Sequence, residues 1–210
     1  MYNMSVNKTI WCIRHGTALH NVMFKYIGTK AYTDKIYQDT KLTDEGIEQS
    51  KYLSVTWKDQ LKVEVVFVSP LTRCLETATH IFSGTNKKLI AVEEIIEYEQ
   101  ANEYCNKRKP KSKLQELFPH VDFSLINEEP KYWKENGNET LFELKKRSED
   151  FRSFIEKRKE KKICVVSHST FLKEFLNGSV GNINEELRHC YPLKQTITVH
   201  QNTAPQNFAE

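Results

Sequence analysis

The sequence lacks any long hydrophobic run. No stretch of its 210 residues approaches the roughly 18 consecutive apolar residues that a membrane-spanning helix needs. Residues 1–8 contain no apolar segment of the kind that forms the centre of a secretory signal. We therefore expect a soluble protein of the cytoplasm that makes no contact with membranes.

The sequence also lacks a large excess of charge of either sign. Lys and Arg number 31 against 28 Asp and Glu, which gives a net charge of +3. Domains that bind nucleic acid are usually strongly basic, with their cations gathered on one face. We therefore expect no nucleic-acid partner, whereas the small positive charge is compatible with an anionic small molecule as the substrate.

Cysteine pairs with the spacing C-x-x-C are absent. The five cysteines are scattered between residues 12 and 190. An odd, dispersed set of this kind is typical neither of a disulfide framework nor of a zinc site. We interpret these residues as free thiols that behave as small apolar side chains, and we expect no metal.

Five short apolar runs predict the strands of a buried sheet. Three of them are nearly continuous in apolarity and rich in β-branched residues, as is typical of strands covered on both faces; they lie at residues 9–13, 63–68 and 163–166. Two weaker runs lie at 88–92 and 196–200. Helical patterns separate the runs, at 44–57, 71–82, 141–158 and 171–176, the last with Gly178 as its C-cap. This alternation predicts a three-layer α/β/α sandwich around a mostly parallel sheet.

A polar stretch with three prolines interrupts the alternation at residues 101–138. We interpret it as an irregular insertion, with short helices at most, that caps the active-site end of the sheet, because long ordered insertions often cover functional sites. The expected organisation is a single domain over residues 1–201, followed by a disordered tail at 202–210.

Basic side chains follow three of the predicted strands. Arg14 and His15 come after the first strand, Arg73 follows the second by one helical turn, and His168 follows the run at 163–166. Ligands of open α/β sheets bind beyond the carboxyl ends of the strands. Each residue taken alone is more often an ordinary surface or turn residue, but four of them at one edge predict an anion site.

These residue types suit a phosphate ester. Arginine is a permanently charged planar donor that matches phosphate oxygens, and two arginines can stabilise the charge that spreads over the transferred phosphoryl group. A neutral histidine has one ring nitrogen free to attack phosphorus. Its other nitrogen needs an acceptor, for which a backbone carbonyl near Gly16 is suitable. A second histidine, kept protonated, adds positive charge.

The ordered set of motifs resembles the histidine phosphatase superfamily, which includes the cofactor-dependent phosphoglycerate mutases. The motifs that carry the resemblance span about residues 9–178: Arg14-His15-Gly16-Thr17, Asn21, Leu42-Thr43 with Gly46 and Gln49, Ser69-Pro70-Leu71-Thr72-Arg73 with Glu76-Thr77-Ala78, and Val166-Ser167-His168-Ser169.

The resemblance implies a phosphoglycerate mutase-like fold and a role for each matching residue. His15 becomes phosphohistidine, Arg14, Arg73 and His168 form the phosphate pocket, and Asn21 assists them. Ser169 stands where the family often has glycine, and we expect it to donate to phosphate. No metal or other cofactor is needed, because the arginines supply the charge that Mg²⁺ supplies in kinases.

The family also uses a carboxylic acid after its fourth strand to protonate the leaving oxygen. Glu97 is the leading candidate here, with Glu94 and Glu99 as alternatives, and an ordinary surface glutamate is an equally good interpretation of any one of them.

A finer resemblance links the chain to one branch of phosphoglycerate-mutase-like proteins whose better-understood members resemble phosphatases. It rests on His20-Asn21, on Cys105-Asn106-Lys107-Arg108 and on Phe118-Pro119 with Val121-Asp122-Phe123. The run 105–108 either brings cations over the substrate or forms a structural loop.

Two departures weaken the mutase interpretation. Ala18 stands where mutases usually have Ser or Thr, and their Arg-His-Tyr-Gly run is not recognisable near residues 99–105. The main hypothesis is therefore hydrolysis of a small phosphorylated molecule, or of a phosphoprotein, through a phosphohistidine. A mutase-type phosphotransferase and a non-catalytic phosphate-binding or scaffold module are the alternatives. The sequence gives no indication of an oligomeric state.

Overall fold

One mixed sheet organises the part of the chain that the structure describes. The computed structural model describes residues 4–100, 102–176 and 190–201, and the sheet order is β4-β3-β2-β5-β1-β6. Neighbouring strands are parallel except β1 with β6. The strands are β1 Met4–Arg14, β2 Val65–Val68, β3 Lys88–Ala91, β4 Val121–Asp122, β5 Lys162–Ser167 and β6 Leu193–Gln201.

Helices connect the strands. The α-helices are α1 Leu19–Ile27, α2 Lys30–Thr33, α3 Asp44–Thr56, α4 Thr72–Ile81, α5 Lys111–Leu117, α6 Leu141–Lys157 and α7 Ser169–Leu176. Short 3₁₀ helices are η1 Lys35–Tyr37, η2 Lys58–Lys62, η3 Glu93–Ile95 and η4 Tyr104–Asn106. None of the helices within the described ranges is both long enough and apolar enough to cross a membrane.

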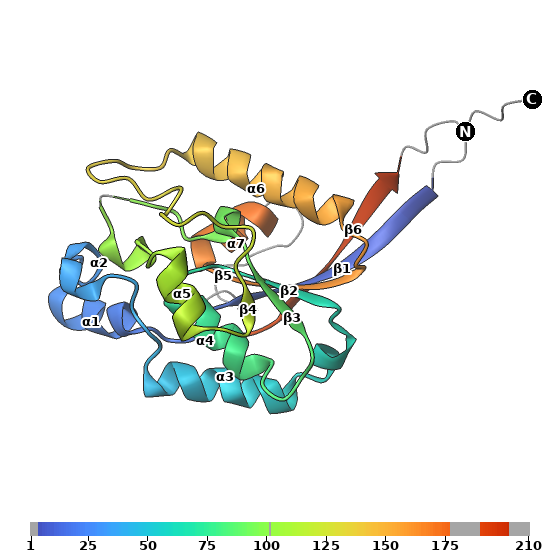
Figure 1. Cartoon of the computed structure of the whole chain (residues 1–210), viewed down its shortest axis with the longest axis horizontal. Helices are drawn as coiled ribbons and strands as arrows, with labels where there is room; N and C mark the ends of the chain where they lie inside the picture. Colours follow the sequence, from blue (N-terminus) through green and yellow to red (C-terminus); the bar gives the residue numbers. More distant parts are fainter. Residues whose placement is uncertain (1–3, 101, 177–189, 202–210) are drawn as a thin grey trace, which may run out of the picture.

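The two faces of the sheet bury alternate side chains of the same strand. Val66 and Val68 pack in a cluster with side chains of α3 and α4, such as Leu75. Val65 and Phe67 pack in a second cluster that includes Phe151 of α6. Figure 1 shows α6 and α7 on one side of the sheet and α3 and α4 on the other. The predicted three-layer sandwich is therefore confirmed, since period-2 alternation sends apolar residues to both faces.

Helix starts follow the expected local chemistry. Thr43 caps α3, where its side chain accepts a hydrogen bond from the Gly46 amide. Thr140 and Glu143 form a capping box at the start of α6, an arrangement that satisfies amides otherwise left without partners. The five predicted strands and four predicted helices are all present, with ends that differ by a few residues. Gly178 and the tail at 202–210 lie outside the described residues.

The stretch 101–138 is more regular than expected. It contains η4, α5 and the short strand β4, which adds to the edge of the sheet by pairing with β3 in parallel. Leu114 and Phe118 are buried in the same cluster as Val66. The short helices agree with the prediction for this stretch, whereas β4 was not predicted, because a two-residue strand carries no detectable period in the sequence. The helices α1 and α2 were also not predicted.

Candidate active site

The carboxyl ends of β1, β2 and β5 bring the predicted basic residues together. The His15 amide donates to the Ser167 carbonyl at 3.0 Å, and the Ser69 amide donates to the Val166 carbonyl at 3.0 Å. These bonds continue the parallel register of the sheet past its last paired residues. As a result the ring centroids of His15 and His168 lie 5.1 Å apart.

His15 is neutral and has a fixed tautomer. Its Nδ1 lies 2.7 Å from the Gly16 carbonyl oxygen, and because a carbonyl only accepts, Nδ1 carries the hydrogen. Burial lowers the pKa of His15 well below its usual value, and the charges of Arg73 and Arg14 lower it further. The lone pair on Nε2 is therefore available for attack, as the sequence analysis anticipated from a carbonyl near Gly16.

Two glycines allow the turn after β1 to press against the start of α3. A Cβ on Gly16 would lie 2.6 Å from the Gly46 carbonyl oxygen, and a Cβ on Gly46 would collide with the Thr17 carbonyl. Gln49 then accepts from the Thr17 amide at 2.9 Å, and Thr77 of α4 accepts from the Gly16 amide at 3.1 Å. Only residues without a side chain fit this close approach of backbones, so the turn that carries His15 is rigidly placed.

Arg73 is buried at the start of α4, with 1% of its surface exposed. Its Nη1 donates to the Cys105 carbonyl at 2.7 Å, and its Nη2 donates to Asn106 Oδ1 at 2.8 Å. The guanidinium is thus aimed by residues of the stretch 101–138, which the sequence analysis did not connect with it.

His168 is fully buried behind His15 and Arg73. Its Nδ1 lies 3.2 Å from Arg73 Nη2 and its Nε2 lies 2.8 Å from Ser69 Oγ. Since arginine only donates, Nδ1 accepts and Nε2 carries the hydrogen. Burial lowers the pKa of His168 well below its usual value, with Arg73 as the next cause. The contact between Nδ1 and Arg73, which the sequence could not show, favours the neutral ring, whereas protonation of His168 beside phosphate stays a prediction.

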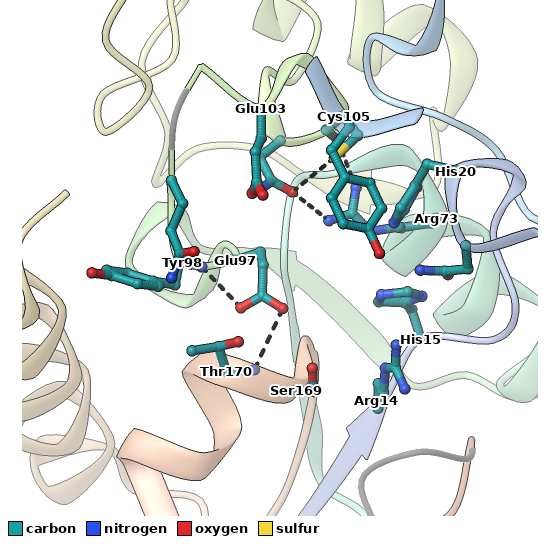
Figure 2. A pocket seen from close by; sticks show the side chains of 14 residues that line it. Arg14, His15, His20, Arg73, Glu97, Tyr98, Glu103, Cys105, Ser169 and Thr170 are labelled. Carbon is teal, nitrogen blue, oxygen red and sulfur yellow. Dashed lines mark hydrogen bonds between the residues drawn. The ribbon is translucent and has the colours of Figure 1, made fainter. Parts of the chain in front are cut away.

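A cavity of about 200 Å³ opens beside these groups (Figure 2). Its lining includes six of the residues predicted from the sequence, namely Arg14, His15, Asn21, Arg73, Glu97 and Ser169. His168 is absent from the lining. Asn21 also fixes the start of α1, because its Oδ1 accepts from the Ala18 amide at 3.0 Å.

Of the three candidate acids, Glu97 is the one that lines the cavity. Its carboxylate accepts from the Tyr98 amide at 2.8 Å and from the Phe171 amide, near the start of α7, at 3.2 Å. Glu94 instead pairs with Lys131 at 3.1 Å. Glu99 is buried behind the cavity, where it accepts from the Glu103 amide at 2.8 Å.

Other residues of the lining were not predicted as site residues, among them Glu103, His20 and Tyr32. Glu103 comes from the stretch 101–138, and burial, followed by the charge of Glu97, raises its pKa to about 7. His20 packs edge-on against Tyr32, with ring centroids 5.5 Å apart. The pair His20-Asn21 was a signal for His20, whereas no pattern in the sequence marks Glu103 or Tyr32.

The run 105–108 does not bring cations to the cavity. Arg108 is buried in an ion pair with Glu93 at 2.8 Å, and Lys107 Nζ lies 3.9 Å from the centre of the Trp133 ring. Of the two interpretations left open by the sequence, the structural loop is therefore correct for these side chains. Cys105 and Asn106 line the cavity and hold Arg73.

A three-layer sandwich with a neutral histidine and two arginines at the carboxyl edge of its parallel strands defines a class of phosphate-handling proteins. The sequence model of the histidine phosphatase superfamily (branch 1) matches residues 10–204, and the chain belongs to that superfamily.

Known relatives agree with this assignment. The chain is 34% identical to phosphoglycerate mutase-like protein 1 of Arabidopsis thaliana over 95% of its own length and 79% of that protein. Among solved structures, the ecdysone phosphate phosphatase of Bombyx mori has a TM-score of 0.59 at 15% identity, covering 97% of this chain and 95% of the other. The alpha-ribazole phosphatase of Shigella flexneri has a TM-score of 0.54 at 23% identity, covering 79% and 76%. These two structures share the fold.

Proposed function

We propose that the protein hydrolyses small phosphomonoesters through a phosphohistidine on His15. The observation that carries the proposal is the neutral His15 ring, whose Nδ1 hydrogen is held by the Gly16 carbonyl and whose Nε2 is left to attack. Arg14 and Arg73 line the same cavity and match the charge of a phosphate dianion. Solved phosphatases with the same fold support this proposal.

The first step forms a bond between His15 Nε2 and phosphorus and breaks the bond between phosphorus and the ester oxygen. Glu97 gives its proton to that oxygen, so the alcohol leaves neutral. The amides of Tyr98 and Phe171 hold the Glu97 carboxyl at the cavity wall.

The second step returns the enzyme to its starting state. Water attacks phosphorus while the Glu97 carboxylate takes its proton, and the bond between Nε2 and phosphorus breaks. Inorganic phosphate leaves and Glu97 is again protonated. The charge that spreads over the phosphoryl oxygens is stabilised by Arg14 and Arg73 in both steps.

The test compares wild type with His15→Ala on p-nitrophenyl phosphate and glycerol 3-phosphate. We expect His15→Ala to lower kcat/KM by about 10³-fold or more, because the nucleophile is lost, and to form no acid-labile phosphoryl adduct. His120→Ala is a matched control, since His120 is exposed and bonds to Thr79 away from the cavity.

Three outcomes would contradict the proposal. Full activity of His15→Ala would rule out a phosphohistidine on His15 as the intermediate. Turnover that requires 2,3-bisphosphoglycerate and returns a phosphoglycerate would assign a mutase instead. Absence of both turnover and adduct in wild type across a panel of phosphate esters would favour a binding module.

A further inference from the structure

The cavity is divided between charges of opposite sign. Figure 2 shows Arg14, His15 and Arg73 on one side of the cavity and Glu97 and Glu103 on the other. The Glu103 side chain points into the space above Glu97. A phosphoryl group held at the arginines therefore leaves the rest of its ester facing the side of the cavity formed by Glu97 and Glu103.

Glu103 is fixed in this position by its neighbours. Its Oε2 accepts from Asn106 Nδ2 at 2.8 Å, and Asn106 Oδ1 in turn accepts from Arg73 Nη2 at 2.8 Å. Its backbone amide donates to Glu99 Oε1 at 2.8 Å. The side-chain amide of Asn106 thus connects the Glu103 carboxylate to the Arg73 guanidinium, which we assign to phosphate binding.

No lysine of the described lining offsets these carboxylates. Arg14 and Arg73 are the only Lys or Arg side chains among the described residues that line the cavity. The three basic residues that follow Asn106 are occupied elsewhere: Lys107 lies over Trp133, Arg108 pairs with Glu93, and Lys109 pairs with Asp39 at 3.1 Å. A second anionic group on a substrate would therefore meet carboxylates at this end.

We propose that Glu103 makes the enzyme selective for phosphate esters of small amino alcohols, whose ammonium group lies at Glu103 while the phosphoryl group lies at Arg14 and Arg73 and Glu97 serves the ester oxygen. The same carboxylate disfavours esters that carry a carboxylate or a second phosphate. This inference rests on the proposed function, since it assumes that the arginine end holds the transferred phosphoryl group.

Burial and repulsion between the carboxylates support the proposal. They raise the pKa of Glu103 to about 7, with burial as the larger cause and Glu97 as the next. A cation placed at Glu103 favours the charged form of that carboxyl group. The buried Glu103 carboxylate therefore stabilises a bound ammonium group more than an exposed carboxylate would, because water screens the charge of an exposed group.

The test uses three substrates of nearly equal size: phosphoethanolamine, propyl phosphate and phosphoglycolate. Their far ends are an ammonium, a methyl group and a carboxylate. At pH 8 we expect wild type to prefer them in that order. Glu103→Gln should lower kcat/KM for phosphoethanolamine and raise it for phosphoglycolate, so that their ratio falls about tenfold or more, the size expected for one charge-assisted contact.

Matched controls separate selectivity from folding and from chemistry. Glu129→Gln makes the same charge change at an exposed position of the same stretch, and it should leave the ratio at the wild-type value. The melting temperature of Glu103→Gln checks that the variant is folded, and Glu103→Asp, which keeps the charge, should retain the wild-type order of substrates.

Two results would overturn the inference and leave the proposed function standing. One is an unchanged ratio of kcat/KM for phosphoethanolamine to kcat/KM for phosphoglycolate in Glu103→Gln, while wild type turns over p-nitrophenyl phosphate. The other is an equal loss on all three alkyl esters with p-nitrophenyl phosphate spared, because that pattern would make Glu103 a proton donor. Lack of any phosphoryl adduct in wild type would instead contradict the proposed function.

Discussion

The cationic half and the carboxylate half of the cavity are built in different ways. The cationic half comes from the end of β1 with the turn after it and from the start of α4. Backbone hydrogen bonds and two touching glycines hold the turn, and Cys105 and Asn106 hold Arg73. The carboxylate half comes from the chain between β3 and η4, and buried ion pairs hold it. Under the proposed function, the end that binds phosphate depends mainly on the sheet and its turns, whereas the end that faces the leaving group depends on contacts between side chains.

Two buried arginines support the carboxylate half. Arg108 donates to Glu93 and to the carbonyls of Asn127, Glu128 and Glu129. Arg147 of α6 pairs with Glu139 at 2.8 Å and donates to the carbonyls of Glu94, Ile96 and Glu97. The backbone of Glu97 is thus held by Arg147, while its carboxylate is held by the amides near the start of α7.

The largest effect that sharpens this comparison is expected from Glu97→Gln. The amide side chain can still accept the bonds from Tyr98 and Phe171, but it cannot deliver a proton. We expect kcat/KM for alkyl esters such as propyl phosphate to fall by about 10²–10⁴-fold, whereas formation of the adduct from p-nitrophenyl phosphate, whose leaving group needs no proton, should change little. An equal loss on both kinds of ester, measured under single turnover, would assign Glu97 to phosphate binding.

The next effect concerns the support of the carboxylate half. Arg108→Met leaves Glu93 buried without its cation, and we expect the free energy of unfolding to fall by about 3–5 kcal/mol. Urea denaturation followed by far-UV circular dichroism measures this loss. Lys113→Met is the control, because Lys113 and Glu116 form an exposed pair whose removal should cost less than about 1 kcal/mol. Equal losses in the two variants would show that the buried pair is not a special support.

A smaller effect follows from Glu99, which burial gives a pKa of about 8. The folded state holds the Glu99 proton at pH values where the unfolded chain has lost it. This contribution to stability is therefore complete below about pH 4.5 and is lost as the pH rises toward 8. Between pH 5 and pH 8, we expect wild type to lose on the order of 1 kcal/mol more unfolding free energy than Glu99→Gln.

Urea titrations at both pH values measure that difference. The exposed variant Glu129→Gln should follow wild type. If wild type and Glu99→Gln lost the same amount of unfolding free energy between the two pH values, Glu99 would titrate alike in the folded and unfolded states.

The cationic half could be predicted because its information is local. Arg14, His15 and Arg73 each follow a strand that is recognisable from its apolarity, and parallel strands bring their carboxyl ends to one edge. The tautomer of His15 also followed from a neighbouring residue. The state of His168 could not be predicted, since it depends on Arg73 Nη2, which the chain supplies from 95 residues away.

Apart from Glu97, which the family resemblance implied, the carboxylate half could not be predicted, for the same physical reason. Glu103 lies in the cavity because its contact with Asn106, which also bonds to Arg73, fixes η4. Arg108 is buried because it pairs with Glu93 and donates to backbone carbonyls of residues 127–129. None of these contacts leaves a period in the sequence. The short strand β4 was missed likewise, as pairing with β3 rather than intrinsic preference makes residues 121 and 122 extended.

The position of β1 in the sheet has a consequence for the order of folding. β1 lies between β5 and β6, so Arg14 acquires its neighbour Ser167 only when nearly all of the intervening chain is in place. Contacts of such long sequence separation close slowly because a large loop must be ordered first. During synthesis, β1 stays unpaired on both edges until its partners β5 and β6 have been made. Folding therefore ends with the pairing of β1, and we expect a chaperone that shields unpaired strands to raise the yield of folded protein.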